Sequence, residues 1–270
     1  DWCDSYEPVA IGDSLTHGTS TPPSYHWGNW FKDPYPVDNE NIKKIWQRVY
    51  PDSSTLSTFI YGQNYSDFVD ILAKNSSSPS VHNVITWGLG YIMYNGSLYY
   101  HYEDELLKFT LSNEALHKVK FIAIHRGYHR GNTRTYVDMK VDEYGFYAIY
   151  ADASNEENLT IRKMNPHTLE TIKEWNTNRR KQSELCATFM VCGKMYTLDN
   201  CWSRLDTDSQ HNQYTYDTLT EKESYENWHL TAKFGHVYMV GYNPRERLLF
   251  AWDNGHLVTY PLVWKKKTHK

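Results

Sequence analysis

Short runs of apolar and aromatic residues, each introduced by a glycine, recur along the chain. Four of these glycines are Gly96, Gly145, Gly193 and Gly235, and apolar and aromatic residues follow each of them closely. Glycine permits positive φ at the tip of a hairpin, and the run behind it suits the returning strand. Helical periodicity is scarce, with 65–73 as the best candidate. The pattern therefore predicts a β-rich chain built from hairpins.

The spacing of these glycines indicates a repeat. They are separated by about 49, 48 and 42 residues, which is the length expected of a four-stranded propeller blade. A fifth copy at 254–260 follows after only about 20 residues and would form a second hairpin within the last blade. Any β protein contains several glycine turns, so the spacing favours a β-propeller without excluding other all-β folds.

Composition and charge exclude some classes of function. Hydrophobic residues make up 40% of the chain, which is enough to bury a core. The 23 Tyr, 10 Trp and 9 Phe suit half-buried strands. A net charge of −4 provides no positive field that would attract nucleic acid. No stretch approaches the roughly 18 consecutive apolar residues of a membrane span, so we expect no membrane insertion.

One motif suggests an enzyme. Residues 12–15 read Gly-Asp-Ser-Leu, the opening block of the GDSL esterases, and 253–256 supply an Asp-x-x-His. Ser14, His256 and Asp253 would then be nucleophile, base and orienting carboxylate of a hydrolase. That fold needs helical crossovers between parallel strands, which this sequence lacks, and 253–256 read as a hairpin turn. A serine esterase is therefore the alternative to a non-enzymatic protein.

Cysteines and glycosylation sequons indicate an extracellular setting. The four cysteines are Cys3, Cys186, Cys192 and Cys201, without a CxxC zinc spacing. The four sequons begin at Asn64, Asn75, Asn95 and Asn158. The chain starts at Asp1 without a signal peptide, which we interpret as a mature chain or an excised domain. An even number of cysteines together with sequons favours a secreted or cell-surface glycoprotein.

Six motifs in a fixed order give the chain its resemblance to a known family. They lie at 94–100, 141–150, 163–170, 174–177, 189–196 and 241–254. Together they resemble the olfactomedin domain. The resemblance implies a five-bladed β-propeller closed by the N- and C-terminal strands, as a single domain over 1–265 with a basic tail at 266–270.

The resemblance also implies a function. Olfactomedin domains are extracellular, non-enzymatic protein–protein interaction modules, secreted or tethered at the cell surface. We therefore expect a cell-surface receptor or matrix protein as partner, in cell adhesion, matrix assembly or neuronal and synaptic signalling. Oligomerisation would come from upstream regions of a longer protein. A purely structural matrix domain is a further alternative.

The family's usual disulfide corresponds to Cys3 and Cys192. For the two remaining cysteines we take Gly193 and Lys194 as a two-residue turn, and counting outward then places Cys186 opposite Cys201. A cross-strand disulfide between them is geometrically plausible. The alternative is two buried free thiols.

Many olfactomedin domains hold calcium at the propeller centre through two aspartates, an asparagine and backbone carbonyls. Carried over to this chain, the first aspartate is Asp138, the asparagine position falls on Ala187, and the second aspartate position is Gly241. One carboxylate cannot easily neutralise a divalent cation. We therefore predict no metal or cofactor, and expect a lysine, an arginine or water beside Asp138.

Overall fold

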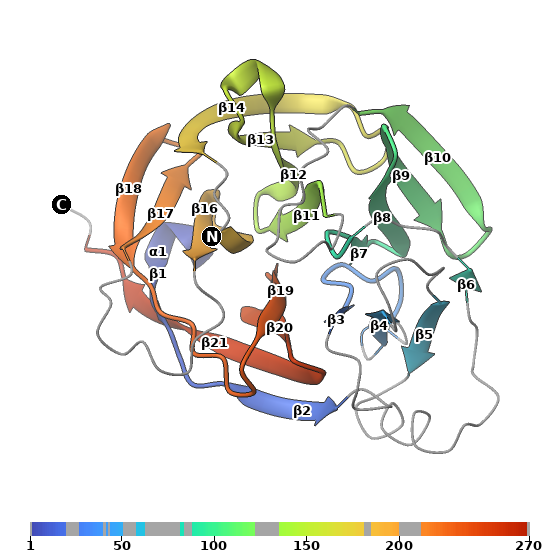
Figure 1. Ribbon diagram of the computed structural model, residues 1–270, viewed down its shortest axis with the longest axis horizontal. Helices are drawn as coiled ribbons and strands as arrows, with labels where there is room; N and C mark the ends of the chain where they lie inside the picture. Colours follow the sequence, from blue (N-terminus) through green and yellow to red (C-terminus); the bar gives the residue numbers. More distant parts are fainter. Residues whose placement is uncertain are drawn as a thin grey trace.

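The computed structural model describes residues 2–19, 27–39, 42, 44–50, 58–62, 82–83, 88–121, 135–180, 185–199 and 212–268. Within these residues the strands form five antiparallel sheets. The sheets are arranged as blades around a common centre, with β7, β11 and β19 at their inner ends (Figure 1). The prediction of an all-β propeller is confirmed.

Four blades are formed by strands that follow one another along the chain. The first comprises β3 (Trp27–Phe31), β4 (Ile45–Tyr50), β5 (Thr58–Gly62) and β6 (His82–Asn83). The second comprises β7 (Ile92–Tyr94), β8 (Ser97–Tyr102), β9 (Glu105–Thr110) and β10 (Ala115–Lys120). The third comprises β11 (Val137–Asp142), β12 (Gly145–Ala151), β13 (Asn158–Met164) and β14 (Thr171–Arg180), with a 3₁₀ turn η2 (Ala153–Asn155). The fourth comprises β15 (Leu185–Val191), β16 (Lys194–Asp199), β17 (Asn212–Asp217) and β18 (Lys222–Asn227).

The fifth blade joins the two ends of the chain. It comprises β19 (Val237–Asn243), β20 (Leu248–Asp253) and β21 (His256–Lys266), and the N-terminal strands β1 (Tyr6–Ile11) and β2 (Leu15–Thr19) both pair with β21. A short helix α1 (Trp2–Ser5) precedes β1. The predicted closure by N- and C-terminal strands is confirmed, because cutting either end would remove strands from this sheet.

The basic end of the chain is partly built into this blade. Lys266 is the last residue of β21 and pairs with Tyr6. The next residue, Lys267, donates its backbone N–H to Ser5 O at 2.8 Å and its Nζ to Cys3 O at 2.7 Å. A domain boundary at 265 therefore falls within the ordered ladder, and the expected tail at 266–270 begins too early.

Three of the glycines expected at hairpin tips lie there with positive φ, whereas Gly235 lies elsewhere. The turns Asn95–Gly96, Cys192–Gly193 and Asn254–Gly255 have positive φ at both residues, as type I′ hairpin turns require. Gly235 instead precedes β19, the innermost strand of the last blade. It therefore lies between two blades and not at a hairpin tip. The interval of 42 residues from Gly193 to Gly235 matches the length of a blade, although Gly235 is not structurally equivalent to Gly193.

The turn of the β15–β16 hairpin lies one residue earlier than expected. Cys192 and Gly193 occupy it, with φ of 51° and 79°, instead of Gly193 and Lys194. The reason is that a type I′ turn requires positive φ at both residues, and Cys192 adopts this conformation. The count that placed Cys186 opposite Cys201 therefore used the wrong register.

Candidate functional site

An ion pair lies at the centre of the propeller, on the strand that carries Asp138. Lys140 is two residues further along β11, so both side chains leave the same face of the strand. Lys140 Nζ lies 2.8 Å from Asp138 Oδ1 and donates to Val240 O on β19 at 2.8 Å. Thr188 Oγ1 on β15 donates to Asp138 Oδ2 at 3.1 Å. The pair therefore connects the inner strands of three blades.

The residue of β15 that contacts Asp138 is the one after Ala187, the position expected to replace the calcium-binding asparagine. Thr188, and not Ala187, contacts Asp138, while Ala187 packs in a hydrophobic cluster with residues such as Tyr196. The pairing of β15 with β16 is regular from Ala187 to Val191, so Ala187 and Thr188 leave opposite faces of the strand, and only Thr188 faces Asp138.

The side chains at the channel centre do not fit calcium. Gly241 lines the cavity beside the ion pair and offers no side-chain oxygen. Calcium takes six to eight oxygen ligands and needs negative charge to balance it. Asp138 is the one carboxylate among the described residues that line the cavity, and both its oxygens are engaged, by Lys140 and by Thr188. An ammonium group 2.8 Å from Asp138 stands where a metal ion would need to approach that carboxylate.

A small cavity of about 30 Å³, lined mainly by apolar groups, adjoins the ion pair. Asn29 lines it and is 1% exposed. Its Nδ2 donates to Leu89 O at 2.7 Å and Tyr91 O at 3.2 Å, whereas its Oδ1 has no hydrogen-bond partner within the described part of the chain. The cavity is large enough for one or two water molecules that would satisfy this oxygen.

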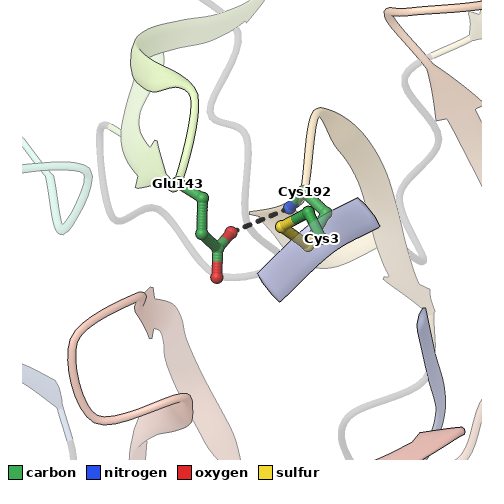
Figure 2. Close-up of side chains that lie close together, drawn as sticks. All are labelled: Cys3, Glu143 and Cys192. Carbon is green, nitrogen blue, oxygen red and sulfur yellow. Dashed lines mark hydrogen bonds between the residues drawn. A yellow bond between two sulfur atoms is a disulfide. The ribbon is translucent and has the colours of Figure 1, made fainter. Parts of the chain in front are cut away.

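The disulfide predicted from the family resemblance, Cys3–Cys192, is confirmed and joins residues 189 positions apart. Glu143 lies beside it (Figure 2). Its Oε2 accepts a hydrogen bond from Cys192 N at 3.0 Å, and its Oε1 accepts one from Tyr242 OH at 2.6 Å. Although two sulfurs and a carboxylate gather here, the cysteines are oxidised and offer no thiolate to a metal. The cluster therefore fastens α1 and three blades together.

Buried aspartates hold the inner hairpin turns from a neighbouring blade. Asp142 Oδ2 accepts a hydrogen bond from Gly193 N at 2.6 Å, across the boundary between the third and fourth blades. Asp33 does the same for the second blade, accepting from Asn95 N at 2.9 Å and Gly96 N at 2.7 Å. Sequence reasoning missed these residues. Their only signal is an aspartate at or just beyond the end of the blade's inner strand.

Burial changes the acidity of these carboxyl groups. The pKa of Asp142 rises to about 6, mainly because burial penalises the carboxylate, with hydrogen bonds from Gly193 and Tyr144 opposing the rise and Glu143 adding to it. The pKa values of Asp33 and Asp253 are also raised, in both cases chiefly by burial.

The folded state should therefore gain stability on mild acidification. A raised pKa means that the native Asp142 binds a proton more readily than the unfolded chain, so this stabilisation is full below about pH 4 and is lost as pH rises through about 6. We expect unfolding in urea to require about 1 kcal/mol more at pH 5 than at pH 7.5. Asp142→Asn should reduce this difference, and exposed Asp13→Asn should keep it. The same pH profile in the wild type and in Asp142→Asn would refute the assignment.

The proposed hydrolase triad does not assemble. His256 lies opposite Thr19 on β2, whereas Leu15, the neighbour of Ser14, lies opposite Thr259. Five residues of strand separate Ser14 from Thr19, or about 16 Å at the usual rise, far beyond the hydrogen-bond distance that a base needs. The carboxylate of Asp253 instead accepts hydrogen bonds from backbone N–H groups of the neighbouring loop. This geometry contradicts the alternative of an esterase triad formed by Ser14, Asp253 and His256.

The structure describes only part of the other predicted sites. Asn64, Asn75 and Cys201 lie outside the described residues. Cys186 is buried and disulfide-bonded, which excludes a free thiol there, and its pairing with Cys201 stays a prediction. Asn95 is exposed at the β7–β8 turn, whereas Asn158 is half-buried at the start of β13.

Comparisons with known proteins agree with the motifs. The profile of the olfactomedin-like domain family matches residues 3–267. Human myocilin is 29% identical over 273 residues, which cover 96% of this chain and 51% of that protein. Rat myocilin is 30% identical over 262 residues, covering 93% and 50%. The chain thus spans about half the length of these relatives.

A solved structure shares the fold. Glutaminyl cyclase from Myxococcus xanthus superposes with a TM-score of 0.51 at 7% identity, covering 97% of this chain and 100% of that one. At this identity the similarity concerns the fold alone. Within the described residues, no helix has the length and apolar character needed to cross a membrane.

Proposed function

The chain belongs to the olfactomedin-like domain family, and from this we propose that it is an extracellular, non-enzymatic protein–protein interaction module. Its partner is a cell-surface receptor or a matrix protein, in cell adhesion, matrix assembly or neuronal and synaptic signalling. The protein is secreted or tethered at the cell surface. Parts of a longer protein beyond this domain oligomerise it.

The family match over residues 3–267 carries this proposal. The separation of Ser14 from Asp253 and His256 supports a non-enzymatic role. The Cys3–Cys192 disulfide supports an oxidising compartment, because disulfides persist in secreted and cell-surface proteins. A closed ring of blades with one clasped end is a rigid scaffold on which loops can bind a partner.

The inner hairpin turns define a surface suited to binding. We call it the turn face, formed by the turns at 95–96, 143–144 and 192–193 and the side chains beside them. Val37 is 62% exposed next to Gly96, and Leu219 is 64% exposed next to Gly193. Tyr35 is 41% exposed on the same loop as Val37. Exposed aromatic and aliphatic side chains over rigid turns are suitable anchors for a protein interface.

A binding screen tests the proposed function. The purified domain, multimerised for avidity, is presented to an array of cell-surface and matrix ectodomains. We expect a saturable interaction that the untagged domain competes. Absence of any interaction at micromolar concentration would favour a purely structural matrix domain. Hydrolysis of a p-nitrophenyl ester that Ser14→Ala abolishes would instead restore the esterase alternative.

Glycosylation offers an independent check on the extracellular setting. When the protein is made in secreting mammalian cells, we expect a glycan on Asn95, because this side chain is exposed at a turn. Since this turn belongs to the turn face, the binding screen uses Asn95→Gln beside the wild type. Half-buried Asn158 lies in a ladder opposite Arg180 and should stay unmodified. Glycopeptide mapping of the wild type measures glycan occupancy at each of the two asparagines. Asn95→Gln and Asn158→Gln are the matched variants. An occupied Asn158 with a bare Asn95 would contradict this expectation.

A further inference from the structure

We infer that Lys140 is a built-in cation that replaces a metal ion at the propeller centre, so that the fold of this chain needs no divalent cation. The inference rests on the position of one ammonium group. Lys140 and Asp138 are 5% and 3% exposed, and their charged atoms are 2.8 Å apart. It is independent of the proposed partner and concerns what holds the blades together.

Charge balance requires a cation at this place. A buried carboxylate is costly unless an opposite charge and hydrogen bonds compensate it. Lys32, the other lysine that lines the cavity, is already paired with Glu246 at 2.8 Å. Among the residues that the structure describes, Lys140 therefore provides the positive charge that neutralises Asp138. A divalent cation added to this pair would leave an excess of two positive charges in a buried site.

Lys140 also reproduces the links between blades that a central metal would make. An ammonium group has three donors. One is directed at Asp138 on its own strand and one at Val240 O on β19, and Asp138 in turn accepts from Thr188 on β15. Three inner strands are thus joined through one lysine and one aspartate. A tethered cation cannot be removed by chelators or by low calcium.

Thermal unfolding in EDTA and in millimolar calcium tests the inference. The wild type should have the same Tm in both. Lys140→Met, which keeps length but removes the charge, should lower Tm by about 10 °C because Asp138 is left uncompensated. The double variant Asp138→Asn/Lys140→Met leaves no uncompensated charge and should recover much of this loss. If Lys140→Met does not fold, the double variant still tests the inference, because it has no uncompensated buried charge and should fold.

A reconstructed metal site provides the positive control. Lys140→Ala/Thr188→Asn/Gly241→Asp removes the tethered cation and restores oxygen ligands around Asp138, so its Tm should rise by several degrees in calcium. Three results would overturn the inference: a calcium-dependent Tm in the wild type, an unchanged Tm in Lys140→Met, or a double variant no more stable than Lys140→Met.

Discussion

Replacing Cys3 and Cys192 together with alanine is expected to lower the free energy of unfolding by about 5 kcal/mol. The disulfide joins residues 189 positions apart. Its removal frees the unfolded chain from one of the longest loops that this sequence could close, and loop-closure entropy grows with loop length. In the folded state it also releases α1 from the turn that Glu143 holds. Urea unfolding monitored by tryptophan fluorescence measures the loss.

Glu143→Gln provides the matched control for the disulfide. It keeps both cysteines but weakens the hydrogen bonds from Cys192 N and Tyr242 OH. We expect a smaller loss of about 1 to 2 kcal/mol, typical of a hydrogen bond to a charged group. If the double cysteine variant lost no more free energy of unfolding than Glu143→Gln, the Cys3–Cys192 disulfide would contribute little to stability. This result would contradict the expectation that the disulfide holds the ends of the ring together.

The second large effect is expected from Gly90→Ala, at the boundary between the second and third blades. A Cβ at Gly90 would lie 2.0 Å from Val137 O, and 3.0 Å from the Cα of Asp138. Gly90 O also accepts a hydrogen bond from Met139 N at 2.9 Å. Because both clashing groups are backbone, no side-chain rotation relieves the contact. We expect a loss of about 3 kcal/mol or more in urea unfolding, at the upper end of overpacking effects.

Gly241→Ala is the control for this substitution. Gly241 lines the central cavity, and the nearest atom to its added Cβ is Met239 Cε at 3.7 Å, an ordinary contact. We expect a change within about 0.5 kcal/mol. Equal losses from the two variants would show that blade contact at Gly90 is not tight.

The sequence predicted the features that depend on local chemistry. Gly96 and Gly193 marked type I′ turns because positive φ is a property of the residue itself. The family motifs predicted the Cys3–Cys192 bridge. Lys140 could also have been found, because residues two apart on a strand share a face and Asp138 was already assigned to the channel.

The features that sequence reasoning missed depend on geometry between distant segments. Thr188 on β15 contacts Asp138 on β11, which lies 50 positions earlier in the chain, and no local pattern marks Thr188 instead of Ala187 for this contact. Asp33 and Asp142 bind turns of a neighbouring blade, more than 45 positions along the chain. Such contacts exist only once the ring has closed, so composition and periodicity could not identify them.

The most direct test of the central claim, that this propeller binds a protein through its turn face, is an affinity measurement on an ectodomain recovered in the screen. Surface plasmon resonance would compare the wild type with Val37→Asp/Leu219→Asp and with Ile172→Asp, whose side chain is 60% exposed on the outer strand β14. We expect the turn-face variant to bind at least about tenfold more weakly, as the loss of interface anchors does, and Ile172→Asp to bind like the wild type. Unchanged binding by the turn-face variant, or an equal loss in Ile172→Asp, would contradict the claim.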